Sequence, residues 1–299
     1  MKYTGPIYRP PFEANSLLLQ VTVGCSHNKC TFCSMYRDVK FCTESIEQIE
    51  KDLLEARELY PIVKRIFLVN ADPFVLSANK LKEIAEKINE ILPEVETIAM
   101  YASINNIKDK TDEELKELRN LKINDLNIGI ESGLDEVVKK LNKGFTIEEA
   151  KKQLKRLSLA GINFSVNIII GAAGRDKSKE NAIANAKFLN LVKPNLIFIA
   201  TLHIDSGSSL EKELINGSFM ENTVGENIKE ELLMLENLNL ENTFFFGLHT
   251  SNVIPVYGFL GEKKQDMITD LKNGLASLNE SYLNKKPLKD SEGRIIRSN

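Results

Sequence analysis

The sequence predicts an α/β protein built on six parallel strands, each followed by a helical or loop connection. Two observations lead to this class. Apolar segments of strand length alternate with segments of helical periodicity from residue 16 to residue 202, and such repeats form parallel sheets. Segments such as FLVN (67–70) and NIIIG (167–171) are also continuously apolar, as expected for strands that are covered on both faces. This pattern fits either an open sheet or a barrel.

The expected elements follow one another regularly through the first two thirds of the chain. Strands are expected at residues 16–23, 65–70, 96–103, 125–132, 162–171 and 195–202. Helices are expected at about 43–60, 78–92, 111–121, 134–141, 147–160 and 178–191. Because helical segments or loops separate the strands, each connection can cross over and return the chain as a parallel neighbour.

The pattern changes after the sixth strand. Helices are expected near 223–239 and over 262–282, and an aromatic strand, TFFFG (243–247), lies between them. The polar C-terminal end of the chain is expected to be loosely ordered. We therefore predict a core domain of residues 1–210 and a C-terminal α/β extension of residues 211–299.

The composition is that of an ordinary soluble protein, with 42% hydrophobic and 27% charged residues. A formal net charge of −3 gives no general electrostatic reason to expect nucleic acid as a partner. We found neither a secretory signal nor an apolar run near the roughly 18 residues of a membrane span, so no membrane association is expected. Four cysteines, three of them in one loop, do not make a disulfide framework. We expect a cytoplasmic protein in a reducing compartment and leave its oligomeric state open.

Three of the four cysteines lie in the loop GCSHNKCTFCSMY (24–36), directly after the first strand. Cys25, Cys30 and Cys33 have the spacing C-x4-C-x2-C, which lets three thiolates converge on one inorganic centre. Three protein ligands on a four-iron cluster would leave one iron open. An open coordination position distinguishes a reactive metal centre from a structural one.

Two other interpretations of the cysteines remain open at this point. The same spacing begins the plant-type ferredoxin motif, in which Cys42 would be the fourth ligand of an electron-transfer cluster. The C-x2-C pair is also typical of structural zinc sites. We expect Cys42, just before a helix, to be a buried or capping-region thiol and not a ligand.

Polar or glycine-rich stretches follow most of the predicted strands. They are NAD (70–72), YAS (101–103), ESG (131–133), GAAG (171–174) and TLH (201–203). Ligands of parallel α/β folds bind at the carboxyl ends of the strands. The sequence therefore predicts a ligand site at these ends, beside the cysteine loop.

Over residues 16–205 the chain resembles the radical S-adenosylmethionine (SAM) superfamily, in the branch typed by Elp3, MiaB and the oxygen-independent coproporphyrinogen oxidases. The three cysteines match the cluster ligands, and Phe32 matches the aromatic residue before the third one. NADP (70–73) occupies the place of the family's Gly-Gly-Glu stretch. IGIESGLDEVVKKLNKG (128–144) is similar to a run typical of the branch, and IIGAAG (169–174) resembles the fifth-strand motif that packs on adenine.

The chain also departs from the family pattern. The cysteine loop is one residue longer than the usual C-x3-C-x2-C. Asn-Ala-Asp (70–72) replaces Gly-Gly-Glu. Asn167 and Gly174 stand where the fifth-strand motif often has Gly and Glu.

The resemblance implies a partial (β/α)6 TIM-like barrel with a C-terminal extension. It implies one 4Fe–4S cluster on the three cysteines and reductive cleavage of SAM to a 5′-deoxyadenosyl radical. That radical would abstract hydrogen from an unidentified small-molecule substrate, with electrons from a donor such as flavodoxin or ferredoxin. One remaining cysteine is too few for a second conventional cluster.

The resemblance also implies a set of SAM contacts. Asp72 is expected near the ammonium group, Glu131 near the ribose or amino acid portion, and the segment 169–174 against adenine. The residues expected to bind SAM are Phe32, Tyr36, Asn70, Ala71, Asp72, Ser103, Glu131, Asn167, Ile169, Gly171 and Leu202.

The loop GLHTSNVIPVYGFLG (247–261) follows the aromatic strand and carries several polar side chains. Polar residues on a loop after a strand are well placed to meet a ligand at the open end of a sheet. We expect His249 and Asn252 to help shape the substrate side of the cavity. The alternative is that the polar residues of this loop form turns and caps.

Overall fold

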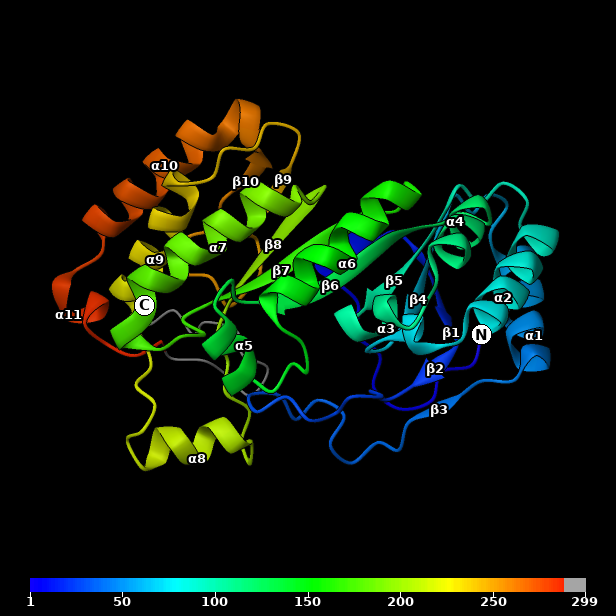
Figure 1. Ribbon diagram of the computed structural model, residues 1–299, viewed down its shortest axis with the longest axis horizontal. Coiled ribbons are helices and arrows are strands. Elements are labelled where there is room, and N and C mark those ends of the chain that lie inside the picture. Colours follow the sequence, from blue (N-terminus) through cyan, green and yellow to red (C-terminus); the bar gives the residue numbers. More distant parts are fainter. Residues whose placement is uncertain (288–299) are drawn as a thin grey trace. The chain divides into compact units, whose positions relative to one another are not determined.

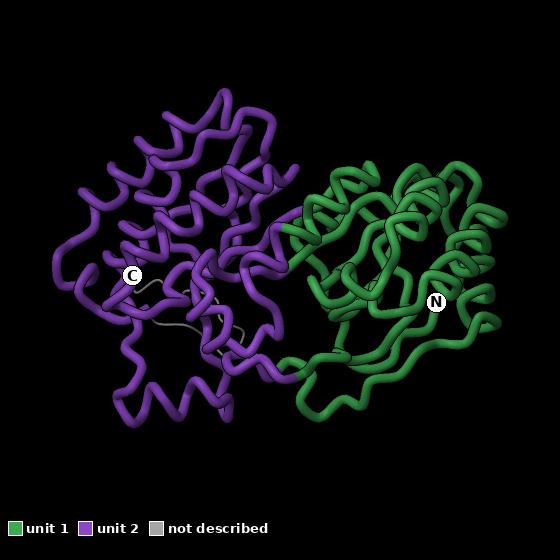
Figure 2. The backbone as a smooth tube through the Cα atoms, in the orientation of Figure 1, with its two compact units in different colours: residues 1–28, 35–128, 152–164 green, residues 29–34, 129–151, 165–299 purple. Residues whose placement is uncertain are grey.

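The computed structural model describes residues 1–287 (Figure 1). These residues form two compact units, shown in different colours in Figure 2. Unit 1 comprises residues 1–28, 35–128 and 152–164, and unit 2 comprises residues 29–34, 129–151 and the chain from 165 onward. The polar end that we expected to be loosely ordered lies largely outside the described residues, and the predicted domain boundary at 210/211 stays a prediction.

Unit 1 contains parallel strands with helices between them. Its parallel strands are β1 (Leu17–Gln20), β4 (Arg65–Val69), β5 (Thr97–Ala102) and the first part of β6 (Ile123–Glu131). β1 pairs with β4, β4 with β5 and β5 with β6, all in parallel. Its helices are α1 (Ile46–Leu59), α2 (Ala78–Ile91), α3 (Ile104–Lys108), α4 (Asp112–Asn120) and the second part of α6 (Ile147–Ala160). Short 3-10 turns lie at Pro11–Glu13 and Pro73–Val75.

Local sequence signals explain where these helices begin. The side chains of Ser45 and Ser77 accept hydrogen bonds from the third residue of α1 and of α2, respectively. Thr111 and Glu114 form a reciprocal capping box at the start of α4. Such caps satisfy backbone N–H groups that have no partner within the helix. The predicted helices 43–60, 78–92 and 111–121 are therefore confirmed within a few residues.

Unit 2 continues the strand–helix alternation. Its strands are the end of β6, most of β7 (Asn163–Ile170), β8 (Leu196–Thr201), β9 (Phe244–Phe246) and β10 (Tyr257–Phe259). β7, β8 and β9 are parallel, and β10 is antiparallel to β9. Its helices are the start of α6, α5 (Asp135–Lys140), α7 (Ser178–Val192), α8 (Ser209–Ile215), α9 (Val224–Glu236), α10 (Leu260–Ser277) and α11 (Glu280–Leu283). A 3-10 turn lies at Arg175–Lys177.

The hydrogen-bonded strand order is β1-β4-β5-β6-β7-β8-β9-β10. The sheet is mostly parallel, helices connect its strands, and its first and last strands are different edges, so it is not closed. This topology confirms the predicted α/β class and is consistent with a partial barrel.

Several details differ from the sequence-based expectation. The first strand does not run to residue 23, because β2 (Thr22–Val23) leaves β1 and pairs antiparallel with β3 (Cys42–Thr43). Cys42 is consequently exposed on β3, so the expectation of a buried thiol was wrong. The parallel series does not end with the sixth strand, because β9 adds to β8 as a further parallel strand.

Short elements account for the other differences. α3, α8 and β10 were not expected, and each is shorter than eight residues, too short for a clear periodic pattern. The helix expected over 262–282 is divided into α10 and α11. The side chain of Asn279 accepts a hydrogen bond from the backbone N–H of Tyr282 and begins the second helix.

Helix α9 carries two adjacent buried glutamates. Burial and the neighbouring carboxylate of Glu230 raise the pKa of Glu231 to about 8 from an ordinary value of 4.5. The buried Oε1 atom of Glu231 has no hydrogen-bond partner among residues 1–287. Glu231 is therefore protonated at neutral pH in the folded protein, whereas it ionises in the unfolded chain.

We expect Glu231→Gln to flatten the pH dependence of stability. Below pH 4.5 the carboxyl is protonated in both states, and from there to about pH 8 only the unfolded state loses its proton. The free energy of unfolding of the wild type should therefore fall, relative to the variant, by on the order of 3 kcal/mol across this interval. Urea titrations of both proteins at pH 5 and pH 8 measure this difference. An equal change in the free energy of unfolding between the two pH values in both proteins would contradict it.

Candidate functional site

The first half of the cysteine loop belongs to unit 1. The backbone N–H of Asn28 donates to Cys25 Sγ at 3.3 Å, and the Asn28 side chain donates to the Tyr36 carbonyl at 2.8 Å. Gly24 and Asn28 both have positive φ angles, +78° and +42°. At Gly24 a side chain would also come within 3.2 Å of the Val39 carbonyl oxygen. The loop therefore turns sharply around Cys25, which glycine and asparagine permit.

The end of β4 holds this half of the loop. The Asp72 carboxylate accepts hydrogen bonds from Ser26, at 2.6 Å from its hydroxyl and at 3.3 Å from its backbone N–H. Asn70 is fully buried; its side chain accepts from the Tyr36 hydroxyl at 3.2 Å and donates to the Thr22 carbonyl at 2.7 Å. The structure thus brings Tyr36, Asn70 and Asp72 together with the half of the loop that contains Cys25.

Asn70 itself is strained, with a φ angle of +81°. A non-glycine residue in this region is uncommon and costs free energy, and such residues cluster at functional sites. Ala71 lies between Asn70 and Asp72 in the chain. Ser103, predicted to contact SAM, is the N-cap of α3 and accepts a hydrogen bond from the Asn106 backbone.

The second half of the loop, residues 29–34, belongs to unit 2 and is fastened to the end of α5. The Thr31 backbone N–H donates to the Leu141 carbonyl at 3.1 Å, and the Thr31 hydroxyl donates to the Lys140 carbonyl at 3.0 Å. The Asn142 side chain donates to the Lys29 carbonyl at 2.8 Å. These bonds satisfy carbonyls at the end of α5 and fix the backbone on both sides of Cys30.

The chain after β8 holds this half of the loop as well. The backbone N–H groups of Asp205 and Leu210 donate to the Phe32 and Thr31 carbonyls at 3.1 and 2.8 Å. The Asp205 carboxylate accepts from the Ser34 backbone N–H at 2.5 Å and from its hydroxyl at 2.9 Å. Cys33 therefore lies between two residues, Phe32 and Ser34, that the segment after β8 holds in place.

Three residues predicted to bind SAM meet in one hydrophobic cluster of unit 2. Phe32, Ile169 and Leu202 pack with buried residues of α5, α8 and the turn after β7. On β7, Asn167 and Ile169 are half-buried, while their neighbours Val166, Ile168 and Ile170 are fully buried, so Asn167 and Ile169 share one face of the strand. Gly171 follows with a φ angle of +83°.

The end of β6 carries Glu131, which is buried and has a φ angle of +70°. Its carboxylate accepts a hydrogen bond from Lys143 Nζ at 2.8 Å. At Gly129 a side chain would come within 2.3 Å of the same carboxylate, so a larger residue there would displace it. Glu131 is thus held in place by a cation 12 residues further along the chain.

Lys143 is a functional candidate that the sequence reasoning missed. Burial alone would lower the pKa of its ammonium group, but the negative charges of Glu131, Cys30 and Cys33 raise that pKa above its ordinary value. Reciprocally, a fixed positive charge beside two thiols favours their thiolate forms, which are the forms that bind metals. The sequence signal for it was its place within residues 128–144, but the direction of its side chain could not be predicted from the sequence.

His249 and Asn252, which we expected on the substrate side of the cavity, both make hydrogen bonds within the protein. The Asn252 side chain donates to the Ile199 and Gly247 carbonyls at 2.9 and 3.0 Å and accepts from the Thr201 hydroxyl at 3.0 Å. His249 Nδ1 lies 2.7 Å from the Ser251 hydroxyl. The amide of Asn252 thus joins β8 to the end of β9, and the substrate role of both residues stays a prediction.

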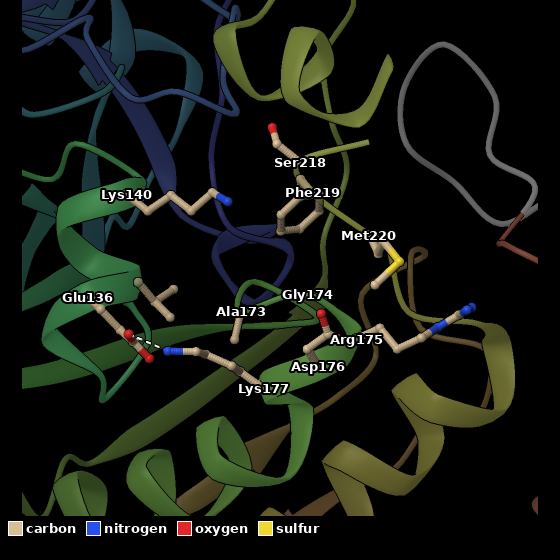
Figure 3. A pocket seen from close by; sticks show the side chains of 11 residues that line it. Glu136, Lys140, Ala173, Gly174, Arg175, Asp176, Lys177, Ser218, Phe219 and Met220 are labelled. Carbon is tan, nitrogen blue, oxygen red and sulfur yellow. Dashed lines mark hydrogen bonds and ion pairs between the residues drawn. The ribbon is translucent and has the colours of Figure 1, made fainter. Parts of the chain in front are cut away.

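A pocket of about 280 Å³ lies in unit 2 (Figure 3). Residues of α5, of the turn after β7 and of the segment 218–220 line it, and two of them, Ala173 and Gly174, belong to the segment 169–174 that we expected against adenine. Its cations are paired: Lys177 with Glu136, Arg175 with Glu226 at 2.9 Å and Lys140 with Glu213 at 2.9 Å. This pocket therefore includes the end of the segment expected against adenine, but none of the other residues predicted to bind the cluster, SAM or substrate.

The cysteines suit an iron–sulfur cluster. All four lie in the described part of the chain, none is in a disulfide bond, and Cys25, Cys30 and Cys33 are each half-buried. Within residues 1–287, no three histidine, cysteine, aspartate or glutamate side chains are grouped to bind a single metal ion. In a four-iron cluster, by contrast, each cysteine binds a different iron.

Among residues 1–287, no helix has the length and hydropathy needed to cross a membrane.

Comparisons with known proteins agree with this chemistry. The family model described as "Radical SAM superfamily" matches residues 19–184. The chain is 24% identical over 189 residues to the heme chaperone HemW of Bacillus subtilis, covering 58% of the chain and 50% of that protein. It is 22% identical to HemW of Buchnera aphidicola, covering 93% of the chain and 78% of that protein. The chain spans about half the length of the first curated relatives it matches.

Solved structures show the same fold. Methylornithine synthase superposes with a TM-score of 0.56 at 15% identity, covering 86% of this chain and 68% of that one. The family match extends from the first strand, through the cysteine loop and the ends of β4, β6 and β7, into α7. The chain therefore belongs to the radical SAM superfamily, whose members use a 4Fe–4S cluster and S-adenosylmethionine.

Proposed function

We propose that this chain is a radical SAM enzyme that binds one 4Fe–4S cluster through Cys25, Cys30 and Cys33. It would cleave SAM reductively and act on a small-molecule substrate. The observation that carries the proposal is the bonding of residues 29–34. Backbone and side-chain groups of α5 and of the chain after β8 hold them, and Lys143, which pairs with Glu131, supplies a positive charge near Cys30 and Cys33. A cluster bound by three cysteines keeps one iron open to a ligand.

The chain's own groups have distinct tasks in this proposal. When bound, the cluster and SAM together supply the one-electron chemistry, so the protein needs to bind, orient and exclude water. Asp72 and Glu131 offer carboxylates for the ammonium and for the ribose or amino acid part of SAM. Asn167, Ile169 and Gly171 line the face of β7 that would meet adenine, and Phe32 and Leu202 lie in one cluster with Ile169.

The remaining partners are part of the same proposal. Reduction of the cluster requires an electron donor such as a flavodoxin or ferredoxin, and the chemistry suits the reducing environment of the cytoplasm. The loop 247–261 would face the substrate, with His249 as the stronger candidate, because the Asn252 amide makes three hydrogen bonds to β8 and the end of β9.

Cleavage of SAM tests the proposal. The protein is reconstituted anaerobically with iron and sulfide, reduced with dithionite and incubated with SAM, and the products are measured by mass spectrometry. We expect methionine and 5′-deoxyadenosine in equal amounts, formed slowly even without substrate. A protein with a reducible cluster that forms neither product would instead be an iron–sulfur electron carrier, and one that takes up zinc but no iron would be a structural zinc protein.

A further inference from the structure

A buried carboxylate on α9 contacts the end of β7. Glu230 is 2% exposed, and its Oε1 atom accepts hydrogen bonds from the Gly171 backbone N–H at 3.1 Å and from the Asn181 side chain at 2.9 Å. Its Oε2 atom accepts from the Ser178 hydroxyl at 2.6 Å and from the Asn222 side chain at 2.8 Å. Four donors from three separate segments therefore converge on one side chain.

The same network reaches the end of β6. Asn181, which donates to Glu230, accepts a hydrogen bond from the Ser132 hydroxyl at 2.6 Å. Ser132 in turn accepts from the Leu134 backbone N–H at 3.0 Å. The hydrogen bonds run in one direction, from the backbone after β6 through Ser132 and Asn181 to Glu230. The turn that follows Glu131 is thus fastened to the same carboxylate as Gly171.

Gly171 needs this support because of its conformation. Its φ angle is +83°, and a side chain there would come within 2.9 Å of Asn227 Oδ1 on α9. Gly171, directly after β7, therefore lies against α9, and its backbone N–H donates to Glu230. Burying a carboxylate is costly unless its hydrogen bonds are well formed, and each oxygen of Glu230 accepts two of them.

Burial raises the pKa of Glu230, while its bonds to Ser178, Asn181, Gly171 and Asn222 oppose that rise. The neighbouring Glu231 has an unpartnered Oε1 among the described residues, and burial together with Glu230 raises its pKa to about 8.

We propose that Glu230 is a positioning residue for SAM: it fixes the ends of β6 and β7, so that Glu131 and the segment 169–171 are held in the geometry that binds the cofactor. This inference rests on the proposed function and names a residue outside the matched family region, which ends at residue 184. The simpler alternative is that the network only holds α7 against α9. The two differ in whether loss of Glu230 weakens SAM binding in a protein that is still folded.

The test compares Glu230→Gln with Glu231→Gln as a matched control. Both variants remove one buried carboxyl from adjacent positions of α9, but only Glu230 contacts Gly171 and Asn181. Glutamine at 230 places an NH₂ group against donors, so the strand ends lose part of their support. We expect the dissociation constant of SAM, measured by equilibrium dialysis on the reconstituted protein, to rise about tenfold. In Glu231→Gln it should stay within about twofold of the wild type.

Hydrogen exchange of the same proteins supplies a readout that does not depend on SAM. Exchange of the Gly171 amide should become faster in Glu230→Gln and stay unchanged in Glu231→Gln. Ser132→Ala breaks only the branch to β6 and should accelerate exchange of the Leu134 amide while Gly171 stays protected. This second variant also covers the case that Glu230→Gln does not fold, because it should raise the SAM dissociation constant on its own.

The outcomes separate the two proposals. Weaker SAM binding in Glu230→Gln and Ser132→Ala, with Glu231→Gln unchanged, supports the positioning role. SAM binding in both variants that matches the wild type overturns it, as does equal weakening in Glu231→Gln. A wild-type protein that holds its cluster but binds no SAM overturns the proposed function, and this inference with it.

Discussion

Replacing Cys30 with alanine is expected to reduce the iron bound by the reconstituted protein from about four atoms per chain to near zero. The same loss is expected for Cys25→Ala and Cys33→Ala, because a four-iron cluster held by only two thiolates is poorly retained. SAM cleavage should fall to background in all three variants. Iron and sulfide analysis, together with the visible absorption of the cluster, measures the effect.

Cys42→Ala is the matched control for this series. Cys42 is exposed and lies on β3, paired with Val23 of β2. Its replacement should leave the iron content and the rate of SAM cleavage unchanged. If Cys42 proved as necessary as the other three, the cluster would have four cysteine ligands, and the electron-carrier interpretation would replace the proposed enzyme.

Arg65→Met is expected to destabilise unit 1 by about 3–5 kcal/mol, because it leaves a buried carboxylate without its cationic partner. Arg65 Nε donates to Glu13 at 2.9 Å, and its Nη2 atom lies 2.6 Å from Asp125. The Glu13 side chain is fully buried. Burial alone would lower the pKa of Arg65, but Glu13 and Asp125 raise it, so the guanidinium stays charged. Urea denaturation at pH 7 measures the loss.

Two further variants test whether the cause is the unpaired charge. Lys64→Met removes the neighbouring ion pair between Lys64 and Glu96. These two side chains are 62% and 67% exposed, so the substitution should change stability little. Combining Arg65→Met with Glu13→Gln removes the guanidinium together with the fully buried carboxylate and should recover much of the loss. A double variant as unstable as the single one would assign the effect to lost packing of the arginine side chain.

The sequence predicts the order of the larger elements because their signals are local. The strands 65–70 and 195–202 and the helices 147–160 and 178–191 each match an observed element within a residue or two. Apolar periodicity and capping residues act over a few positions of chain, so they can be recognised without knowing the fold. The cysteine spacing is local in the same sense.

The rest of the site depends on contacts that no local pattern records. Lys143 meets Glu131 only because α5 turns the chain back toward the end of β6. Glu230 reaches Gly171 from a helix that begins more than fifty residues later. The left-handed conformations of Asn70 and Glu131 are likewise imposed by tertiary structure. Asn252 was expected to face substrate, and its bonds to Ile199, Thr201 and Gly247 emerge only when β8 and β9 are neighbours.

The most direct measurement is the electron paramagnetic resonance spectrum of the reduced, reconstituted protein with and without SAM. Binding of SAM at an iron that lacks a cysteine ligand changes the electronic environment of the cluster. We therefore expect the g values to shift on addition of SAM, in the wild type and in Cys42→Ala alike. A reduced 4Fe–4S spectrum that stays unchanged at saturating SAM, with no 5′-deoxyadenosine formed, would contradict an open iron that binds SAM.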